Sequence, residues 1–130
     1  MEPGSSARRG LILFAHGARD PQWRTPFERL RQMAQAQLAA VDVRLAFLEL
    51  MTPSLADAVR QLAQGGCGEI TVVPVFLGQG GHVRRDLPLL IAQLQKDHPQ
   101  LALKSVDAVG EDAAVLQAIA AYCVASLPGR

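Results

Sequence analysis

Hydrophobic positions follow two different periods along this chain, and the two periods alternate. Short apolar runs of strand length are separated by stretches in which apolar residues recur every three or four positions, as on one face of a helix. The runs predict buried strands at 11–15, 43–50, 70–77 and 101–106. The stretches after them predict helices at 26–40, from Thr52 through Ala63, from the glycine loop to Lys96, and at about 112–126.

This order of elements, with short loops, predicts an α/β fold. Parallel strands need helical crossovers, so we expect a four-stranded parallel sheet flanked by helices, in a flavodoxin-like, three-layer single domain over residues 10–128. Pro74 removes one backbone donor from the third strand and must occupy a position where that donor is not needed. The two halves of the chain share a βαβα plan, which hints at an internal repeat.

Composition and charge narrow the class of protein. The 130 residues are 49% hydrophobic and carry a formal charge of +1, with no basic run longer than the pairs Arg8-Arg9 and Arg84-Arg85. Nucleic-acid and membrane-surface partners both need a concentrated basic face, so neither is expected. The longest apolar runs are also far shorter than the roughly 20 residues of a spanning helix.

The two cysteines and the first nine residues indicate the cellular compartment of the protein. Cys67 and Cys123 are isolated, which indicates neither a disulfide framework nor a thiolate zinc site. Residues 1–9 lack the apolar core of a secretory signal and are expected to form a flexible leader. We therefore expect a cytoplasmic protein.

The polar residues that close the strands are the candidates for chemistry, because ligands of open parallel sheets bind beyond the carboxyl ends of the strands. His16 follows the first strand, Glu49 lies near the end of the second, and His82 ends the loop after the third. A lone strand-end histidine commonly bonds a nearby carbonyl, and His82 could simply cap a connector. Two imidazoles on neighbouring loops suit Co²⁺, Ni²⁺, Fe²⁺ or Zn²⁺, so together they predict a metal site.

Glu49 has only apolar neighbours in the sequence F-L-E-L-M. Burying its carboxylate without a partner would cost several kcal/mol, and Arg44 projects to the opposite face of the same strand. We therefore expect Glu49 to take up protons or to bind metal.

Four further polar residues have two interpretations each, and His98 has one. Asp20 and Asp86 each follow a histidine by four positions and could orient an imidazole, although a place at a helix N-terminus is favoured. Arg84 and Arg85 could meet the carboxylates of a polyacidic ligand or remain solvated. His98 is expected at the opposite end of the sheet.

Three segments together resemble the small CbiX/SirB-type class II chelatases, which insert cobalt or iron into sirohydrochlorin. They are L-I-L-F-A-H-G-A-R-D-P at 11–21, F-L-E-L-M-T-P-S-L at 47–55 and V-V-P-V-F-L-G-Q-G-G-H-V-R-R-D-L-P at 72–88. The resemblance covers nearly the whole chain after the leader, and the third segment is its most specific part. Ala18 departs from the family pattern, which more often has Ser after H-G.

The resemblance implies a sheet of the predicted kind and, for a chain of this length, a homodimer with the active cleft between equivalent faces. Position by position, it implies that His16 and His82 are metal ligands and that Glu49 is the acid of the site. It further implies that the tetrapyrrole is lined by the stretch Phe76, Leu77, Gly78, Gln79, Gly80 and Gly81. Arg84 and Arg85 could meet the carboxylates of this ligand.

The resulting hypothesis is a lyase, a sirohydrochlorin chelatase of cobalamin or siroheme biosynthesis, with the divalent metal as co-substrate and no organic cofactor. His16 or Glu49 would accept the two pyrrole protons. Co²⁺, Fe²⁺ and Ni²⁺ all suit such ligands. Two other classes stay open: a Co²⁺ or Ni²⁺ carrier or sensor without turnover, and a flavodoxin-like module that binds phosphate at its glycine loop, which is disfavoured because no Lys or hydroxyl residue follows the glycines.

Overall fold

The computed structural model describes residues 8–129 and contains one sheet of four parallel strands. The strands are β1 (Arg8–Ala15), β2 (Val41–Phe47), β3 (Cys67–Pro74) and β4 (Ala102–Ser105), and their spatial order is β2-β1-β3-β4. β1 pairs with β2 from Arg9↔Val41 to Ala15↔Phe47 and with β3 on its other side. The predicted α/β fold with a four-stranded parallel sheet is confirmed.

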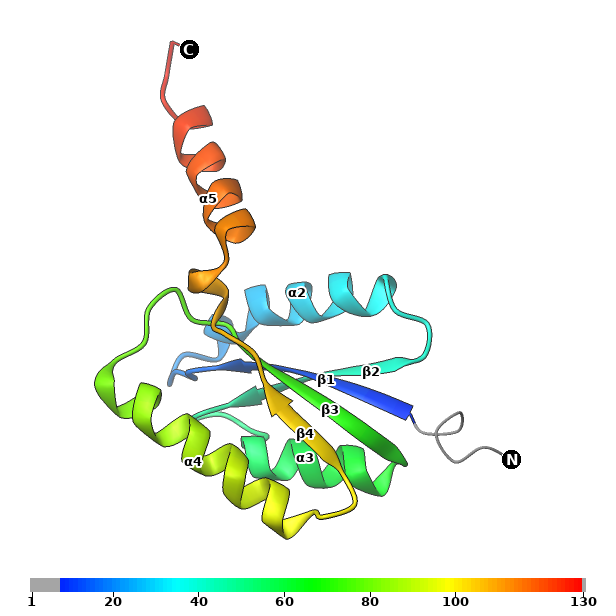
Figure 1. Cartoon of the computed structure of the whole chain (residues 1–130). Helices are drawn as coiled ribbons and strands as arrows, with labels where there is room; N and C mark the ends of the chain where they lie inside the picture. The colour runs from blue at the N-terminus through cyan, green and yellow to red at the C-terminus, as the bar shows by residue number, and fades with distance from the viewer. Residues whose placement is uncertain (1–7, 130) are drawn as a thin grey trace.

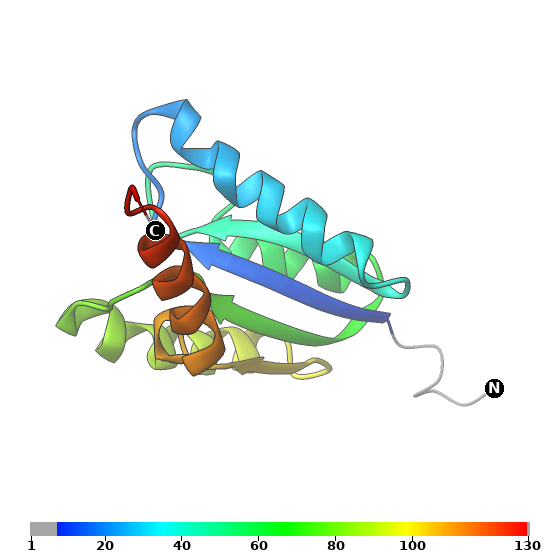
Figure 2. The ribbon, with the colours of Figure 1, turned by 90° about the horizontal axis from the view of Figure 1, so that it is seen from above.

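Helices cover the two faces of this sheet unequally (Figures 1 and 2). α3 (Leu55–Gln64) and α4 (Gly81–Asp97) lie on one face, and α2 (Thr25–Ala36), preceded by the short helix η1 (Pro21–Arg24), lies on the other. η2 (Val109–Glu111) and α5 (Ala113–Ala125) follow β4. The sheet therefore has two helices on one face and a single helix on the other.

Alternation along the central strands divides the core into two clusters. On β1, Ile12 and Phe14 are buried among residues of α3 and α4, whereas Leu13 and Ala15 belong to the cluster under α2. Successive side chains of a strand point to opposite faces, so a strand covered on both sides appears in the sequence as an unbroken apolar run. This is why the run at 11–15 predicted the strand.

The ends of the elements differ from the predictions by a few residues. β1 begins at Arg8, so Arg8 and Arg9 belong to a strand and not to a leader, and the rest of that leader lies outside the described residues. β3 ends at Pro74, and β4 pairs with β3 only as far as Val72↔Ser105. Since the N–H of Val75 bonds the Phe14 carbonyl on the β1 side, the nitrogen of Pro74 faces the β4 side beyond the last paired residue, where no donor is needed.

Two glutamines make the same set of hydrogen bonds sixty positions apart. The Gln35 side chain donates to the carbonyls of Leu38 (3.2 Å) and Val41 (2.7 Å) and accepts from the N–H of Val43 (3.0 Å). Gln95 does the same with His98 (3.1 Å), Leu101 (2.7 Å) and Leu103 (3.0 Å). The units β1-α2-β2 and β3-α4-β4 are therefore built alike.

α5 departs from the expected arrangement, in which every helix flanks the sheet. It rises away from the body in Figure 1, none of its residues is buried, and its main contacts are with η2. Within residues 8–129, no helix combines the length and the apolar character that crossing a bilayer would require.

Candidate functional site

The loops after β1 and β2 are bound to each other at the carboxyl end of the sheet. Beyond the last paired residues of these strands, the N–H of Leu48 donates to the Ala15 carbonyl (2.9 Å) and the N–H of Glu49 donates to the His16 carbonyl (3.0 Å). The two predicted residues His16 and Glu49 therefore lie on adjacent backbone segments. The strand ends bring them together, as the topology predicted.

Gly17 makes this close approach possible. Its φ is +95°, and a Cβ at this position would overlap the carbonyl oxygen of Glu49. Only glycine reaches such a φ without strain, so the His16-Gly17 pair permits the loop to turn directly against the Glu49 backbone. The sequence contains a signal for this requirement, the glycine that directly follows His16.

His16 is half-buried and its imidazole rests against the ring of Phe76, with ring centroids 4.3 Å apart and planes tilted by 44°. Phe76 is itself buried and contacts Phe14 on β1, at 5.9 Å between centroids. The aromatic contact therefore fixes the imidazole at the end of β1, beside the loop that follows β3.

Glu49 is exposed, so the expectation of a carboxylate enclosed by apolar neighbours is wrong. β2 ends at Phe47, and both flanking leucines, Leu48 and Leu50, are exposed as well. The reason is the turn that follows β2, in which Leu50 adopts a positive φ of 66°. Arg44 pairs with Asp42 at 2.9 Å, in keeping with its predicted place away from Glu49.

Arg24 holds the segment 48–54 in place. Its guanidinium donates to the Thr52 carbonyl (2.8 Å) and to Glu28 (3.0 Å), and it lies over the Phe47 ring at 4.9 Å from the centroid. Burial alone would raise the pKa of Glu28, but the hydrogen bonds from Arg24 and Arg31 outweigh it and hold that pKa below its usual value. The sequence did not single out Arg24, since its contacts with Thr52 and Phe47 join positions that are distant in the chain.

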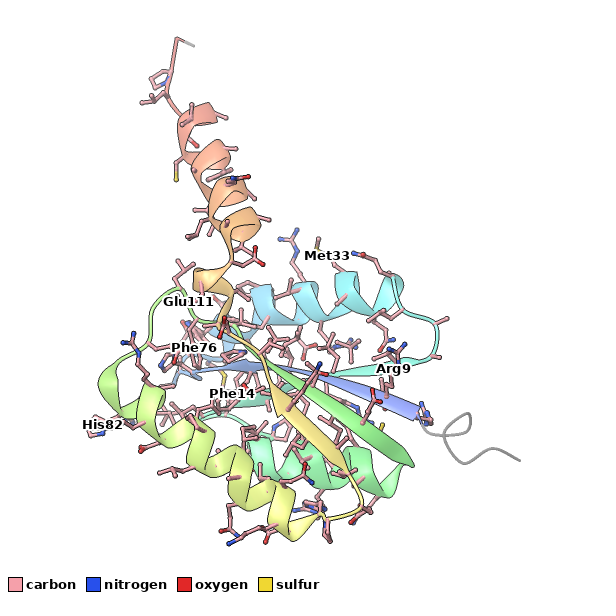
Figure 3. All side chains as sticks on the ribbon, viewed as in Figure 1. Arg9, Phe14, Met33, Phe76, His82 and Glu111 are labelled. Carbon is pink, nitrogen blue, oxygen red and sulfur yellow. The ribbon has the colours of Figure 1, made fainter. Side chains whose placement is uncertain are left out.

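His82 lies in the first turn of α4 and not in the preceding loop. Its side chain is exposed and, in Figure 3, points outward at the N-terminal end of α4. Phe76, by contrast, lies in the body of the protein in that view. The N-cap is Gly80, whose carbonyl accepts from the N–H of Arg84 (3.1 Å). A single chain therefore does not bring His82 into the group formed by His16 and Glu49.

The glycines before α4 border open space. A Cβ on Gly78, Gly80 or Gly81 would meet no atom within 4 Å, and none of the three has a positive φ. This loop therefore does not use the positive φ that glycine permits, but its glycines leave room for a ligand.

A cavity of about 390 Å³ lies beside this stretch, between the ends of β3 and β4 and the first turns of α4. Gln79 and Arg84 contribute to its wall together with Asp107, whereas Arg85 is exposed. Gly110 closes the neighbouring loop: its N–H donates to the Phe76 carbonyl (3.0 Å), and a Cβ on it would overlap the Leu77 carbonyl. No sequence pattern indicated a role for Gly110, because this contact joins two loops that are distant in the chain.

The remaining candidate residues lie at helix ends or on an exposed helix surface. Asp20 caps η1 by accepting from the N–H of Gln22 (2.9 Å), Asp86 is exposed on α4, and His98 is the C-cap residue of α4 at the opposite end of the sheet. Among the described residues, no three His, Cys, Asp or Glu side chains lie close enough together to hold a metal ion. Within one chain, the candidate site is therefore the open carboxyl edge of the sheet, at which the imidazole of His16 is held in place.

Comparison with known proteins gives a consistent result. The sequence model of the CbiX family matches residues 10–123. The chain is 35% identical over 81 residues to a sirohydrochlorin cobaltochelatase of Methanopyrus kandleri, covering 62% of this chain and 57% of the relative. It is 31% identical over 88 residues to that of Methanocaldococcus jannaschii, covering 68% and 62%. The chain thus spans about three fifths of the length of these curated relatives.

Solved structures share the fold. A CbiX protein of Marinobacter aquaeolei, assigned to cobalamin (vitamin B12) biosynthesis, superimposes with a TM-score of 0.79 at 30% identity, over 89% of this chain and 94% of that one. The sirohydrochlorin chelatase SirB of Bacillus subtilis in complex with cobalt gives a TM-score of 0.77 at 22% identity, over 92% of this chain but 51% of SirB. The latter likeness concerns the fold alone.

Proposed function

This chain belongs to the CbiX family, and we propose that it inserts a divalent metal ion into a sirohydrochlorin-type tetrapyrrole, as a lyase of cobalamin or siroheme biosynthesis. The observation that carries the proposal is the fixed imidazole of His16 at the carboxyl edge of the sheet, against Phe76 and next to the Glu49 backbone. The curated relatives named sirohydrochlorin cobaltochelatase support the choice of macrocycle, and they support cobalt as one of its metals.

Metal insertion exchanges two pyrrole N–H protons for one divalent ion, so the site needs a ligand for the metal and an acceptor for the protons. An imidazole nitrogen is a good ligand for Co²⁺, Fe²⁺ or Ni²⁺ and leaves coordination positions open for the ring nitrogens. His16 has this role in the proposal. Glu49, whose exposed carboxylate lies on the neighbouring loop, accepts the released protons and passes them to solvent, or His16 accepts them itself.

The loop after β3 provides the surface for the macrocycle. The stretch 76–81 borders open space, and its exposed Leu77 offers an apolar contact for a flat ring. Arg84 and Arg85, in the first turns of α4, are exposed and free to form bidentate contacts with acetate and propionate groups. His82 stands in the same turn and is proposed as the second metal ligand.

His82 points away from His16 within one chain, so we propose that the working site includes a second copy of this chain. Two copies in a homodimer would place two carboxyl edges face to face, with the macrocycle between them. The chain lengths support this arrangement, because the superposition with this chain covers 51% of the cobalt-bound SirB chain and 48% of SirB with Fe³⁺.

We further propose that the protein works in the cytoplasm, where Cys67 and Cys123 would stay reduced; both are free thiols in the structure.

The proposal is tested by mixing the purified protein with sirohydrochlorin and Co²⁺, Fe²⁺ or Ni²⁺ in separate anaerobic reactions. Catalysis predicts an absorbance change of the macrocycle at a rate proportional to protein concentration, with many turnovers per chain. A metal carrier or sensor would bind about one ion per site and leave the rate at its uncatalysed value, and that outcome would refute the chelatase.

A further inference from the structure

The outer edge of β2 borders a cleft that is lined by charged side chains. β2 is an edge strand of the sheet, and a cavity of about 390 Å³ lies along the side that does not pair with β1. Figure 2 shows β2 at the margin of the sheet, with α2 beside it. We call this cavity the β2-edge cleft; its charged residues are Arg24, Glu28, Arg31, Asp42 and Arg44. Small-molecule pockets measure roughly 300–1,000 Å³, so the cleft is large enough for a ligand.

Its guanidinium groups are held in place from both faces of the sheet. Arg24, Glu28 and Arg31 follow one another at intervals of four and three residues, which puts them on one flank of α2. Glu28 accepts from Arg24 (3.0 Å) and from Arg31 (3.2 Å). On the other face, Arg44 makes two hydrogen bonds to Asp42, at 2.9 Å and 3.1 Å. Ordering these long side chains in advance lowers the entropy cost of binding a ligand.

Positive charge is in excess in the β2-edge cleft. Near neutral pH its three guanidinium groups face two carboxylates, which leaves one positive charge. Arg31 uses only its Nε to reach Glu28, and Arg24 uses its Nε and one terminal nitrogen. Within residues 8–129, no group accepts from the two terminal nitrogens of Arg31 or from the second one of Arg24. The cleft therefore has charged donors to spare.

The backbone of β2 adds one more donor. The N–H of Val43 points away from β1 and donates to the Gln35 side chain (3.0 Å). The N–H of Phe47 points the same way and donates to the Pro53 carbonyl (2.9 Å). Because alternate residues of a strand share one direction, the N–H of Leu45 between them also points away from β1, and no group of the described residues accepts from it. Leu45 lines the cleft although it is only 4% exposed, and an N–H in such a place needs an acceptor.

We propose that the β2-edge cleft binds a small oxyanion, a carboxylate or phosphate group, between the arginine side chains and the N–H of Leu45. Guanidinium groups form bidentate, charge-assisted hydrogen bonds with both kinds of group. The excess positive charge disfavours a cation, and the polar lining disfavours an apolar ligand. Arg24 also donates to the Thr52 carbonyl, so the bound anion would lie beside the segment that carries Glu49.

Charged side chains on an edge strand also have a protective role, because they discourage pairing with another sheet. Protection requires the charges and no ligand, and it gives no function to an N–H that faces a cavity of this size. The two accounts differ in one measurable respect, which is whether the β2-edge cleft binds an anion.

Binding is tested by titrating the full chain, labelled with ¹⁵N, with inorganic phosphate in one series and with succinate in another. Sodium chloride keeps the ionic strength constant, so that screening does not change during the titration. The proposal predicts that the amide signal of Leu45 shifts and saturates in at least one series, with a Kd of about 1 mM or lower. The series that saturates identifies the class of anion. A Leu45 signal that stays in place or drifts without saturation in both series would overturn the proposal.

Variants then show which side chains hold the anion. Arg31→Gln should raise the Kd about tenfold or more, because it removes two terminal donors and one positive charge. Arg31→Lys keeps the charge without the planar fork and should give an intermediate Kd. Arg29→Gln is the matched control, since Arg29 is exposed on the same helix and does not line the cleft. Circular dichroism checks the fold of each variant. A folded Arg31→Gln protein that binds as tightly as wild type, or an equal loss in Arg29→Gln, would contradict the assignment.

Discussion

The backbone N–H of Glu49 donates to the carbonyl of His16 at 3.0 Å, and this hydrogen bond joins the loops that follow β1 and β2. It continues the pairing of two strands whose register is set by the core, from Arg9↔Val41 onward. The pairing of β1 with β2 thus determines the position of His16. Substitution of the residues that permit or stabilise the contact between the two loops should therefore affect the site.

Gly17→Ala should destabilise the protein and abolish metal insertion. Alanine at a φ of +95° costs about 1–3 kcal/mol, and its Cβ would displace the Glu49 carbonyl. Thermal unfolding and the anaerobic absorbance assay measure the two effects. Gly65→Ala is the control, because its φ is −82° and a Cβ there meets its neighbours at ordinary distances of 3.5 Å or more. Equal behaviour of the two variants would show that the close approach at Gly17 is unimportant.

Arg24→Gln should loosen the segment 48–54 and lower the rate of metal insertion, since it removes the bonds to Thr52 and Glu28 and the cation on Phe47. A loss of about 1–2 kcal/mol in unfolding free energy is expected. The matched variant is Arg60→Gln, which breaks only the exposed pair with Asp57 and should leave the stability nearly unchanged. An unchanged insertion rate in Arg24→Gln would show that the contacts of Arg24 do not support the site.

Gln35→Leu and Gln95→Leu should each cost about 2–3 kcal/mol, measured by urea unfolding. Each glutamine makes three hydrogen bonds to backbone groups at the start of a strand, and a leucine leaves those groups without partners. Gln93→Leu, which loses only an exposed bond to Asp97, should be nearly neutral. A large difference in unfolding free energy between Gln35→Leu and Gln95→Leu would argue against the likeness of β1-α2-β2 and β3-α4-β4.

Asp42 should make stability depend on pH in the acid range. Hydrogen bonds from Arg44 hold the pKa of Asp42 below its usual value, against the opposing effect of burial. Because the folded pKa is lower than the unfolded value of about 3.9, the stabilisation is complete above that value and is lost as the pH falls through the folded pKa. Melting temperatures of wild type and Asp42→Asn should differ at pH 6 and converge toward pH 2.5. A constant difference would contradict this assignment.

The sequence predicted those features that depend on local pattern. The run at 11–15 predicted β1, and the apolar repeat from Thr52 through Ala63 predicted α3, which Ser54 caps and after which Gly65 is the C-cap residue. The exposure of Glu49 could not be predicted, because it depends on where the chain leaves β2 and not on its neighbours in sequence. His82 fell on α4 because the helix begins directly after Gly80.

The hint of an internal repeat holds for the scaffold and does not extend to the two histidines. Gln35 and Gln95 occupy equivalent places, but sixty residues before His82 stands Gln22, not a histidine. The outward course of α5 also had no signal in the sequence, since an all-apolar helix usually predicts burial within its own chain.

In the proposed reaction, His16 holds the metal during its insertion into the macrocycle. The most direct measurement is the rate of the Co²⁺-dependent absorbance change of sirohydrochlorin under anaerobic conditions, for wild type, His16→Ala and His98→Ala. Losing a metal ligand should lower the rate at least about 100-fold in His16→Ala, whereas His98→Ala, at the far end of the sheet, should match wild type. A folded His16→Ala protein that inserts cobalt at the wild-type rate would contradict the account.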